Sequence, residues 1–503
     1  MIKYNLSNKL QNTLKNIENV DIIDISEFIK KLLSKNNSNY NNQYSEYIDW
    51  INSAEFMNTQ ISGINEFVSR TKSFKKFIFV GMGASSIVPK LMSNDDEKLL
   101  YVDGSDSCLN NELFNNPKNN LIFFVSKTGS TLETKTIMNN YINYITENYP
   151  DFKYNDNLIA ITDHGSELYD FAVKNNFREV FSNLPNMSGR FSPISFTGLI
   201  PAAISGINIK NLLDNITEYK KLLISNNLQR KNLVKLITLI YKLAHNKNNI
   251  FRLYSPHKNN DSKIIWLQQM IAESLSKNPN YLIPILAEHN SHLNTKAIIN
   301  IVFSNENTKE SYNLANTISI NDCIPGSENF GSLVYTIMII ISSLSFIDGN
   351  NNPYTQPDVE KAKNPKYLEA SIISDENHNN ISKNKINYIS FLLFINDKKE
   401  IKKSIKIILN KMKNIDIPIF VDIAPSYLHT TGELHKKNYG ALHLLIYSDS
   451  INTNNLDNLN LNNLLNMQIN AEIKILKENK LTFQLVSANN LTKIINKNFK
   501  GFI

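Results

Sequence analysis

Six residues between an apolar run and a helical pattern combine the groups that bind anions. Residues 121–125 (LIFFV) are typical of a buried strand of a parallel sheet, and residues 126–131 read SKTGST. Residues 132–137 then favour a helix, with Glu133 in its first turn. A hydroxyl-rich turn at a helix N-terminus presents free backbone N–H groups and O–H donors to an anion. Four hydroxyls and a lysine exceed what an N-cap needs, so we predict a phosphate site.

Two further turns carry weaker signals. Residues 81–86 (GMGASS) follow the apolar run 77–80 and open a helix. Glycines after a strand are common in any α/β fold, so this turn alone indicates little. Residues 189–193 (GRFSP) place Arg190 before the apolar run 194–204. A lone arginine at a turn is more often a surface or capping charge than a functional group.

The stretch 264–274 (IIWLQQMIAES) contains a candidate acid/base group. On a helix, Gln269 and Glu273 lie four residues apart and share a face, which Lys277 joins if the helix continues. Such a row could be a solvated face. Apolar neighbours on both sides favour partial burial of Glu273, and burial raises the pKa of a carboxylate towards one useful for a base.

The rest of the chain supplies the elements that position these groups. Short apolar runs alternate with helical patterns, which is typical of a doubly wound parallel sheet. In such sheets ligands bind beyond the carboxyl ends of the strands, where the first two turns would lie. We predict an α/β protein with two αβα sandwich domains, parallel sheets and a further α/β segment. The expected divisions are a mainly helical segment (1–74), a first domain (75–211), a second domain (212–382) and a C-terminal segment (383–503).

Composition excludes several classes of protein. The 503 residues are 42% hydrophobic and 20% charged, which describes a folded chain and not a disordered one. The net charge of +7 is spread among asparagines and does not indicate nucleic acid. Cys108 and Cys323 have no motif around them and are expected to be reduced. Residues 1–10 lack a signal-peptide pattern, and the apolar run 333–347 is too short to span a bilayer, so we predict a cytoplasmic protein without a membrane segment.

Taken in order, the motifs resemble the glucose-6-phosphate isomerase family, in which two sugar isomerase (SIS) domains flank one active site. The resemblance covers roughly residues 47–485 and is specific as a set, although any single motif is weak. It is closest to the isomerase half of bifunctional transaldolase/glucose-6-phosphate isomerases, and it leaves no room for a transaldolase barrel. The motifs are GMGASS (81–86), SKTGSTLET (126–134), GRFSPISFTGLIPAA (189–203), WLQQMIAES (266–274), QPDVEKAK (356–363) and LHTTGELHK (428–436).

The resemblance implies a site for a small sugar phosphate. Glu273 would move a proton between C2 and C1, which a carboxylate in a partly dry cleft can do. Arg190 would stabilise the enediolate because its charge is permanent, and Lys363 would assist ring opening. No redox step occurs, so neither a nicotinamide nor a metal cofactor is required. The implied substrate-binding residues are Gly83, Ser85, Ser126, Lys127, Thr128, Thr131 and Gln269.

Three departures from the family pattern stand out. Ala84 occupies a usual glycine position and Thr355 a common aspartate position, and neither is a proposed acid, base or phosphate ligand. The usual ring-opening histidine, within a glycine-glutamine-histidine motif, is absent. The loop 428–436 offers His429 and His435 instead, and we predict His435, ahead of His292.

The resemblance favours an enzyme that interconverts glucose 6-phosphate and fructose 6-phosphate in glycolysis and gluconeogenesis, as a homodimer. One rival is a regulator that senses sugar phosphates. Such regulators usually pair one SIS domain with a DNA-binding helix-turn-helix, whereas this chain has two SIS-like units and Glu273. A second rival, the isomerase half of an amidotransferase, needs a nucleophilic cysteine near its N-terminus, and none precedes Cys108. A divergent sugar-phosphate isomerase of different specificity is a third alternative.

Overall fold

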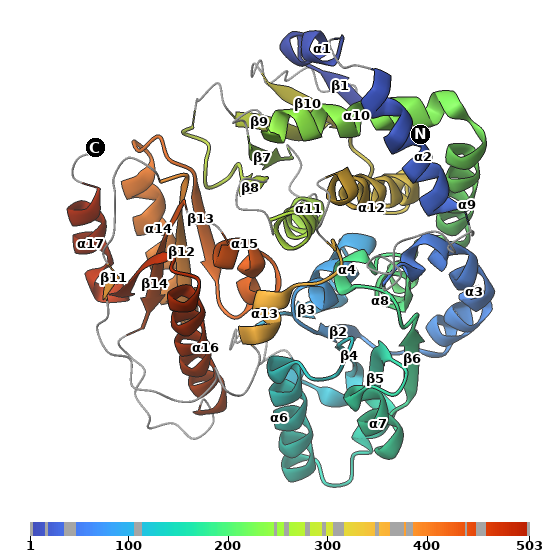
Figure 1. The fold of residues 1–503 in the computed structure, drawn as a ribbon. Coiled ribbons are helices and arrows are strands. Elements are labelled where there is room, and N and C mark those ends of the chain that lie inside the picture. The colour runs from blue at the N-terminus through green and yellow to red at the C-terminus, as the bar shows by residue number, and fades with distance from the viewer. Residues whose placement is uncertain are drawn as a thin grey trace.

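The computed structural model describes residues 4–15, 19–34, 47–104, 113–245, 249–255, 261–276, 282–293, 298–304, 316–347, 352–362, 377–378, 386–437, 440–448 and 459–499. Within these residues the chain forms three five-stranded sheets, each with its own helices, around a common centre (Figure 1). The α/β class and the parallel sheets agree with the prediction.

The first sheet is parallel throughout, and its order reverses between β2 and β4. The chain runs from β2 outward to β3 and then returns to β4 on the other side of β2. Ligands of doubly wound sheets bind at such a switch point, where the turns after β2 and β4 both begin. In sheet order the strands are β3 (Leu99–Val102), β2 (Lys76–Val80), β4 (Asn120–Val125), β5 (Leu158–Asp163) and β6 (Glu179–Asn183).

Helices cover both faces of this sheet because successive strand residues point to opposite sides. Phe123 packs into one core cluster and the adjacent Phe124 into another. The first cluster includes side chains of α3 (Ser53–Arg70), α4 (Ala84–Met92) and α8 (Phe196–Ile204), and the second those of α6 (Leu132–Asn148) and α7 (Glu167–Lys174).

The second sheet has one antiparallel edge strand, supplied by the N-terminus. We expected residues 1–74 to be a mainly helical segment, and within it Tyr4 of the short strand β1 pairs with Ile320 of β10. In order, the strands are β1 (Tyr4–Leu6), β10 (Thr317–Asn321), β9 (Ile298–Ser304), β7 (Ile250–Tyr254) and β8 (Ile283–Leu286). The helices of this half are α1 (Asn8–Lys15), α2 (Asn19–Leu33), α9 (Ile209–Ser225), α10 (Asn227–His245), α11 (Asp261–Ser274) and α12 (Phe330–Ile347).

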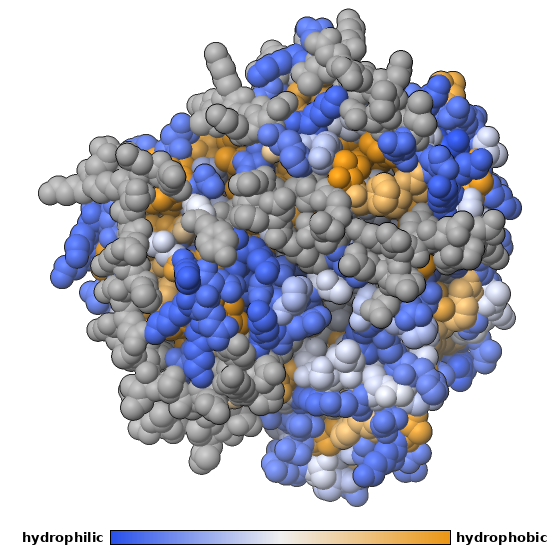
Figure 2. Space-filling view, in the orientation of Figure 1, coloured by the Kyte–Doolittle hydropathy of each residue, from blue (hydrophilic) through white to orange (hydrophobic). Residues whose placement is uncertain are grey.

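Helix α12 is long and apolar enough to cross a membrane, with a mean hydropathy of 2.0. However, 83% of it is buried, and it packs against α2, α9, α10 and α11. It is therefore the core helix of this half. Figure 2 shows a described surface that is largely hydrophilic on the face in view. Large exposed apolar side chains such as Val173, Leu228 and Ile324 are scattered singly, as is normal for a folded chain.

The third unit is a mostly parallel sheet in the C-terminal part of the chain. Its first strand, β11, precedes the division expected at residue 383. In order, the strands are β11 (Asn377–His378), β15 (Thr482–Ser487), β14 (Ala441–Tyr447), β12 (Tyr388–Phe394) and β13 (Ile419–Ile423). Its helices are α14 (Lys398–Met412), α15 (Gly432–Lys437), α16 (Leu459–Glu478) and α17 (Leu491–Asn498).

Helices from all three units meet at the centre of Figure 1. Helix α11 packs against α4 and α15, and α15 packs against α13 (Pro357–Ala362). Two single-turn helices enter the same region, namely η5 (Gly189–Phe191), beside α4 and α11, and η8 (Ser426–His429), beside α15. The remaining short helices are η2 (Asp49–Asn52), η3 (Pro117–Asn119), η4 (Tyr154–Asn157) and η10 (Ala488–Asn490).

The turn after β4 is tied to the end of β5. Lys127 Nζ lies 3.2 Å from Asp163 Oδ2, and the Asp163 N–H donates to the Lys127 carbonyl at 3.1 Å. Burial raises the pKa of Asp163 from 3.8 to about 6, an effect that the nearby Lys127 opposes. Asp163 therefore takes up a proton more readily in the folded chain than in the unfolded one.

This shift predicts a pH dependence of stability. Between pH 3.8 and about 6 the folded state binds a proton that the unfolded state has released. The stabilisation from this proton is fully present below 3.8 and is lost as the pH rises through 6. Asp163→Asn removes the titration, so the Tm difference, wild type minus variant, should fall between about pH 4 and 7 in thermal unfolding. A difference that is constant or rises across this window contradicts the shift.

Candidate active site

Arg190 lies on η5, which packs against α4 and α11, and its side chain is 3% exposed. Its Nη1 donates to Glu273 Oε2 at 2.8 Å, and its Nε to Ser274 Oγ at 2.8 Å. Its Nη2 donates to the carbonyls of Pro353 at 2.7 Å and Thr355 at 3.1 Å. The guanidinium is therefore bound to the end of α11 and to the segment before α13.

Gln269 and Glu273 face the same way on α11, as their spacing predicts. Gln269 Nε2 donates to Glu273 Oε1 at 3.3 Å and to the carbonyl of His429 at 2.7 Å. Glu273 is only 3% exposed, so it lies between the arginine and the amide in a nearly dry setting. The sequence expected a partly buried carboxylate, and the structure places it deeper and beside Arg190.

The electrostatics of this pair depend on burial. Burial lowers the pKa of Arg190, and the carboxylates of Glu273, Glu433 and Glu360 oppose that effect. Two buried charges are costly unless each is paired and hydrogen-bonded. Arginine is the cation that stays charged in such a place. The arrangement can therefore hold a basic carboxylate beside a permanent positive charge, which suits proton transfer at carbon.

In the turn after β4, the side-chain hydroxyl groups form hydrogen bonds with one another. Ser126 Oγ lies 3.2 Å from Thr131 Oγ1 and accepts the N–H of Gly129 at 3.1 Å. Thr131 occupies the N-cap position of α6, yet its side chain makes no capping hydrogen bond. Simple capping therefore does not account for this residue. Gly129 has φ +70, and a Cβ there would lie 2.2 Å from the backbone nitrogen of Leu168, so the turn requires glycine.

Lys127 does not point into this turn, in contrast to the expected phosphate contact. Its Nζ donates to the carbonyls of Pro185 at 3.0 Å and Met187 at 2.9 Å, next to Asp163. It also lies over the ring of Tyr47, 4.7 Å from the centroid. The ammonium has all these partners within the protein, so it connects the turn after β4 to the loop before Arg190.

The turn after β2 supports the C-terminal unit. Gly83 has φ +55, and a Cβ there would lie 2.5 Å from the carbonyl oxygen of His429. Ser85 follows in the first turn of α4 and is half-buried. Ala84 packs beside Gly189, where an added Cβ would lie 3.4 Å from the Ala84 Cβ. Thr355 uses its carbonyl to bind Arg190, so the side chain at that position is not the essential group.

His435 lies in the core of the third unit and is fully buried. Its Nε2 lies 2.8 Å from Asp422 Oδ2, and its Nδ1 lies 3.1 Å from the hydroxyl of Tyr388. Both ring nitrogens are thus engaged, and the structure does not bring the ring to Glu273. Most of the polar stretch 428–436 is buried within the protein. His292 lies 3.0 Å from the carbonyl of Ile415 through Nε2.

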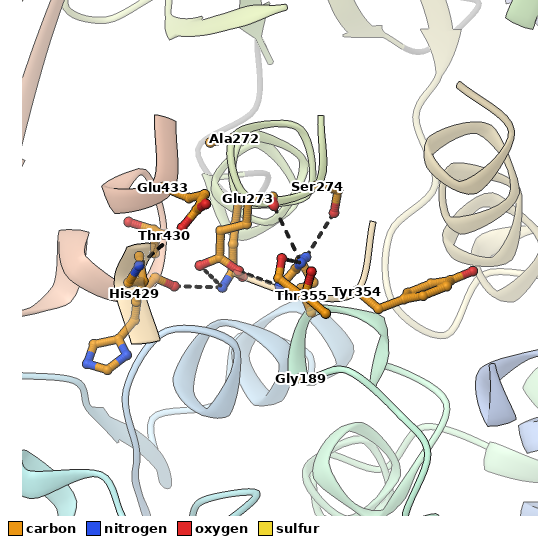
Figure 3. A network of polar contacts seen from close by, with 12 residues as sticks. Gly189, Ala272, Glu273, Ser274, Tyr354, Thr355, His429, Thr430 and Glu433 are labelled. Carbon is orange, nitrogen blue, oxygen red and sulfur yellow. Dashed lines mark hydrogen bonds and ion pairs between the residues drawn. The ribbon is translucent and has the colours of Figure 1, made fainter. Parts of the chain in front are cut away.

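His429, the last residue of η8, contacts the site through its main chain. Its carbonyl accepts from Gln269, while its ring points away from Glu273 (Figure 3). The ring Nε2 lies 3.3 Å from Glu133 Oε1, which also accepts from Gln468 Nε2 at 2.7 Å. Glu133 is 4% exposed and lies in the first turn of α6, directly after the turn that follows β4. Sequence reasoning noted Glu133 only as a residue of the helix first turn.

Two expected residues lie outside the described part of the chain. Helix α13 ends at Ala362, so the placement of Lys363 stays a prediction, as does that of Lys277. Glu433, which sequence reasoning did not single out, does belong to the described centre. It is fully buried and lies close enough to Arg190 to influence its charge.

Comparison with solved structures shows the fold. A hypothetical protein from Thermus thermophilus superposes with a TM-score of 0.59 at 17% identity, over 72% of this chain and 97% of that one. A glucose-6-phosphate isomerase from Chlamydia trachomatis gives 0.54 at 15% identity, over 70% and 83%. No family model matches the sequence.

Sequence relatives agree with the motifs. A probable glucose-6-phosphate isomerase of Methanococcus maripaludis is 25% identical over 246 residues, which are 46% of this chain and 55% of the relative. The glucose-6-phosphate isomerase of Methanocaldococcus jannaschii is 28% identical over 232 residues, 42% and 54% of the two chains. The chain thus spans about half the length of these relatives. The finer likeness to bifunctional enzymes stays a prediction. Over somewhat less than half of its length, the chain is therefore similar in sequence to glucose-6-phosphate isomerases.

Proposed function

We propose that the chain is a glucose-6-phosphate isomerase, which interconverts glucose 6-phosphate and fructose 6-phosphate through an enediol(ate). The observation that carries the proposal is the buried Glu273 carboxylate held by Arg190 and Gln269. Its relatives bear the same name, and the substrate class follows from them. The step belongs to glycolysis and gluconeogenesis.

The substrate phosphate binds at the turn after β4. Backbone N–H groups and the hydroxyls of Ser126, Thr128 and Thr131 are the donors, and the dipole of α6 favours the negative charge. The Lys127 side chain supports the turn through its carbonyl partners instead of contacting the phosphate. Gly83 and Ser85, at the neighbouring turn, contact the sugar.

Proton transfer is assigned to Glu273. Its carboxylate removes the proton from C2 and returns it to C1 on the same face of the open chain. The enediolate oxygen then carries negative charge, which Arg190 stabilises from a position fixed by Ser274, Pro353 and Thr355. Gln269 keeps the base oriented.

Ring opening is assigned to His429 with Glu133, in place of the His435 predicted from the sequence. The assignment rests on the Glu133 carboxylate, which orients the His429 ring, and on the His429 carbonyl, which accepts from Gln269. The Glu133–His429 pair lies directly beyond the phosphate turn, whereas both nitrogens of His435 are bound within a core. Lys363 keeps its expected supporting role.

We further propose that the enzyme works in the cytoplasm as a homodimer. The support is the family resemblance and the use of the apolar helix α12 as a core element. Sugar phosphates are its small-molecule partners.

The function is tested by a coupled assay that supplies fructose 6-phosphate and measures glucose 6-phosphate. The wild type should turn over, and Glu273→Gln should lose about 10²- to 10⁴-fold in kcat, because the amide cannot accept the proton. In deuterated water the wild type should incorporate deuterium at C2. The control is Glu288→Gln, since that side chain is 68% exposed. Exchange at the wild-type rate in Glu273→Gln would remove this residue from the mechanism.

The phosphate turn is tested with 6-phosphogluconate, which resembles the open sugar. Thr131→Asp places a negative charge against the phosphate and should weaken binding at least about tenfold, as measured by calorimetry. Thr146→Asp is the matched control, because Thr146 is exposed on the same helix α6. Equal affinity in wild type and Thr131→Asp would show that the phosphate binds elsewhere.

The ring-opening assignment separates two histidines. His429→Ala should lower turnover of the cyclic sugar by about 10²- to 10⁴-fold, while proton exchange on an open-chain analogue survives. Glu133→Gln should change activity in the same direction. His435→Ala should chiefly lower Tm, because it leaves a cavity in a core. If His435→Ala shows the selective loss and His429→Ala behaves like wild type, the role returns to His435.

A further inference from the structure

Glu433 is a buried carboxylate of the C-terminal unit whose bonds lead into the site. It lies on α15 and is fully buried. Its Oε2 accepts the backbone N–H groups of Asp358 at 3.2 Å and Val359 at 3.1 Å. These two donors belong to the first turn of α13, where backbone N–H groups lack partners within the helix. Its Oε1 has no hydrogen-bond partner among the described residues.

The segment that Glu433 holds is the same one that holds Arg190. The carbonyls of Pro353 and Thr355 accept from Arg190 Nη2, only a few residues before the two N–H groups. Arg190 Nη1 in turn binds Glu273. One series of hydrogen bonds therefore runs from α15 through the segment 353–359 to the arginine and then to the carboxylate of α11 (Figure 3).

We propose that Glu433 is a positioning residue: by accepting two N–H groups of α13 it fixes the segment 353–359, whose carbonyls orient Arg190 against Glu273. The proposal rests on the proposed isomerase function and adds a residue outside the expected site. Glu433 acts through the arginine and needs no contact with the sugar. It also fixes the start of the helix that leads to Lys363.

The surroundings of Glu433 indicate that acceptance of hydrogen bonds matters more than charge. Burial, and next the carboxylate of Asp358, raise the pKa of Glu433, while the bond to Val359 and the charges of Lys436 and Lys437 lower it. A carboxyl group keeps a carbonyl oxygen for the two N–H groups even when it is protonated, and a glutamine amide does the same. Glutamine should therefore replace Glu433 in this role, and alanine should not.

A matched control exists at the same contact between α15 and α13. Lys437 Nζ lies 2.7 Å from Asp358 Oδ2, and the lysine side chain is 33% exposed. Lys437→Ala removes a partly exposed ion pair between the two helices and leaves both bonds of Glu433 in place. The Asp358 carboxylate is only 2% exposed, so Lys437→Ala measures what loss of a charge at this contact does by itself. It should disturb kcat and the segment 353–359 less than Glu433→Ala does, because both N–H bonds of Glu433 remain.

The experiment compares wild type, Glu433→Ala, Glu433→Gln and Lys437→Ala as purified full chains. Steady-state kinetics with fructose 6-phosphate give kcat and KM, and hydrogen–deuterium exchange gives the protection of the peptide spanning residues 353–362. Glu433→Ala should lower kcat by up to about 100-fold through misplacement of Arg190. Its KM should change little, because the phosphate turn is untouched. The peptide should exchange fastest in Glu433→Ala, and Glu433→Gln should recover both kcat and protection.

Two results would overturn the proposal. One is wild-type kcat and protection in Glu433→Ala, and the other is Glu433→Gln with the same losses as Glu433→Ala while still folded by its Tm. The exchange measurement does not depend on activity. A wild type that fails to convert fructose 6-phosphate therefore counts against the proposed function, whereas the protection of residues 353–362 decides the positioning by Glu433.

Discussion

The buried ion pair between Arg190 and Glu273 requires hydrogen-bond partners, and the surrounding elements supply them. Each charge has lost its water, and a buried pair is stable only if its remaining hydrogen-bonding groups also find partners. The partners of Arg190 come from α11 and from the segment before α13, and the amide beside Glu273 is held by the C-terminal unit. Removing any of these elements would expose or orphan a charge. The geometry of the site therefore depends on how the three units pack against one another.

Many of the groups that hold Arg190 and Gln269 in place are main-chain atoms. The carbonyls of Pro353, Thr355 and His429 accept from the arginine and the glutamine, and Gly83 lacks a Cβ where His429 comes close. Such contacts depend on backbone position and not on the side chain at each point. This explains why Ala84 and Thr355 are compatible with the site although both depart from the family pattern.

The sequence predicted those features that depend on local periodicity. The spacing of Gln269 and Glu273 fixed their common face, and strand-turn-helix patterns located the turns after β2 and β4. Long-range pairing was beyond such reasoning. The residues around Lys127 do not indicate that its ammonium group will donate hydrogen bonds to the carbonyls of Pro185 and Met187. Likewise, Glu133 and His429 contact each other although they are 296 residues apart in the sequence. Nor does the sequence indicate that His435 lies in a core, where its two ring nitrogens contact Asp422 and Tyr388.

The pairing of β1 with β10 imposes an order on how the protein is made. Tyr4 leaves the ribosome before its partner Ile320, which is synthesised roughly 300 residues later. At about 5–20 residues per second, the N-terminal strand waits for something between a quarter of a minute and a minute. The whole first sheet, from Lys76 to Asn183, is translated during that interval and can fold on neighbours close in sequence. Strand β1 can therefore pair only after the whole first sheet has been translated. When β10 is made, the strand that covers its edge is already present, which leaves that edge little time to pair wrongly.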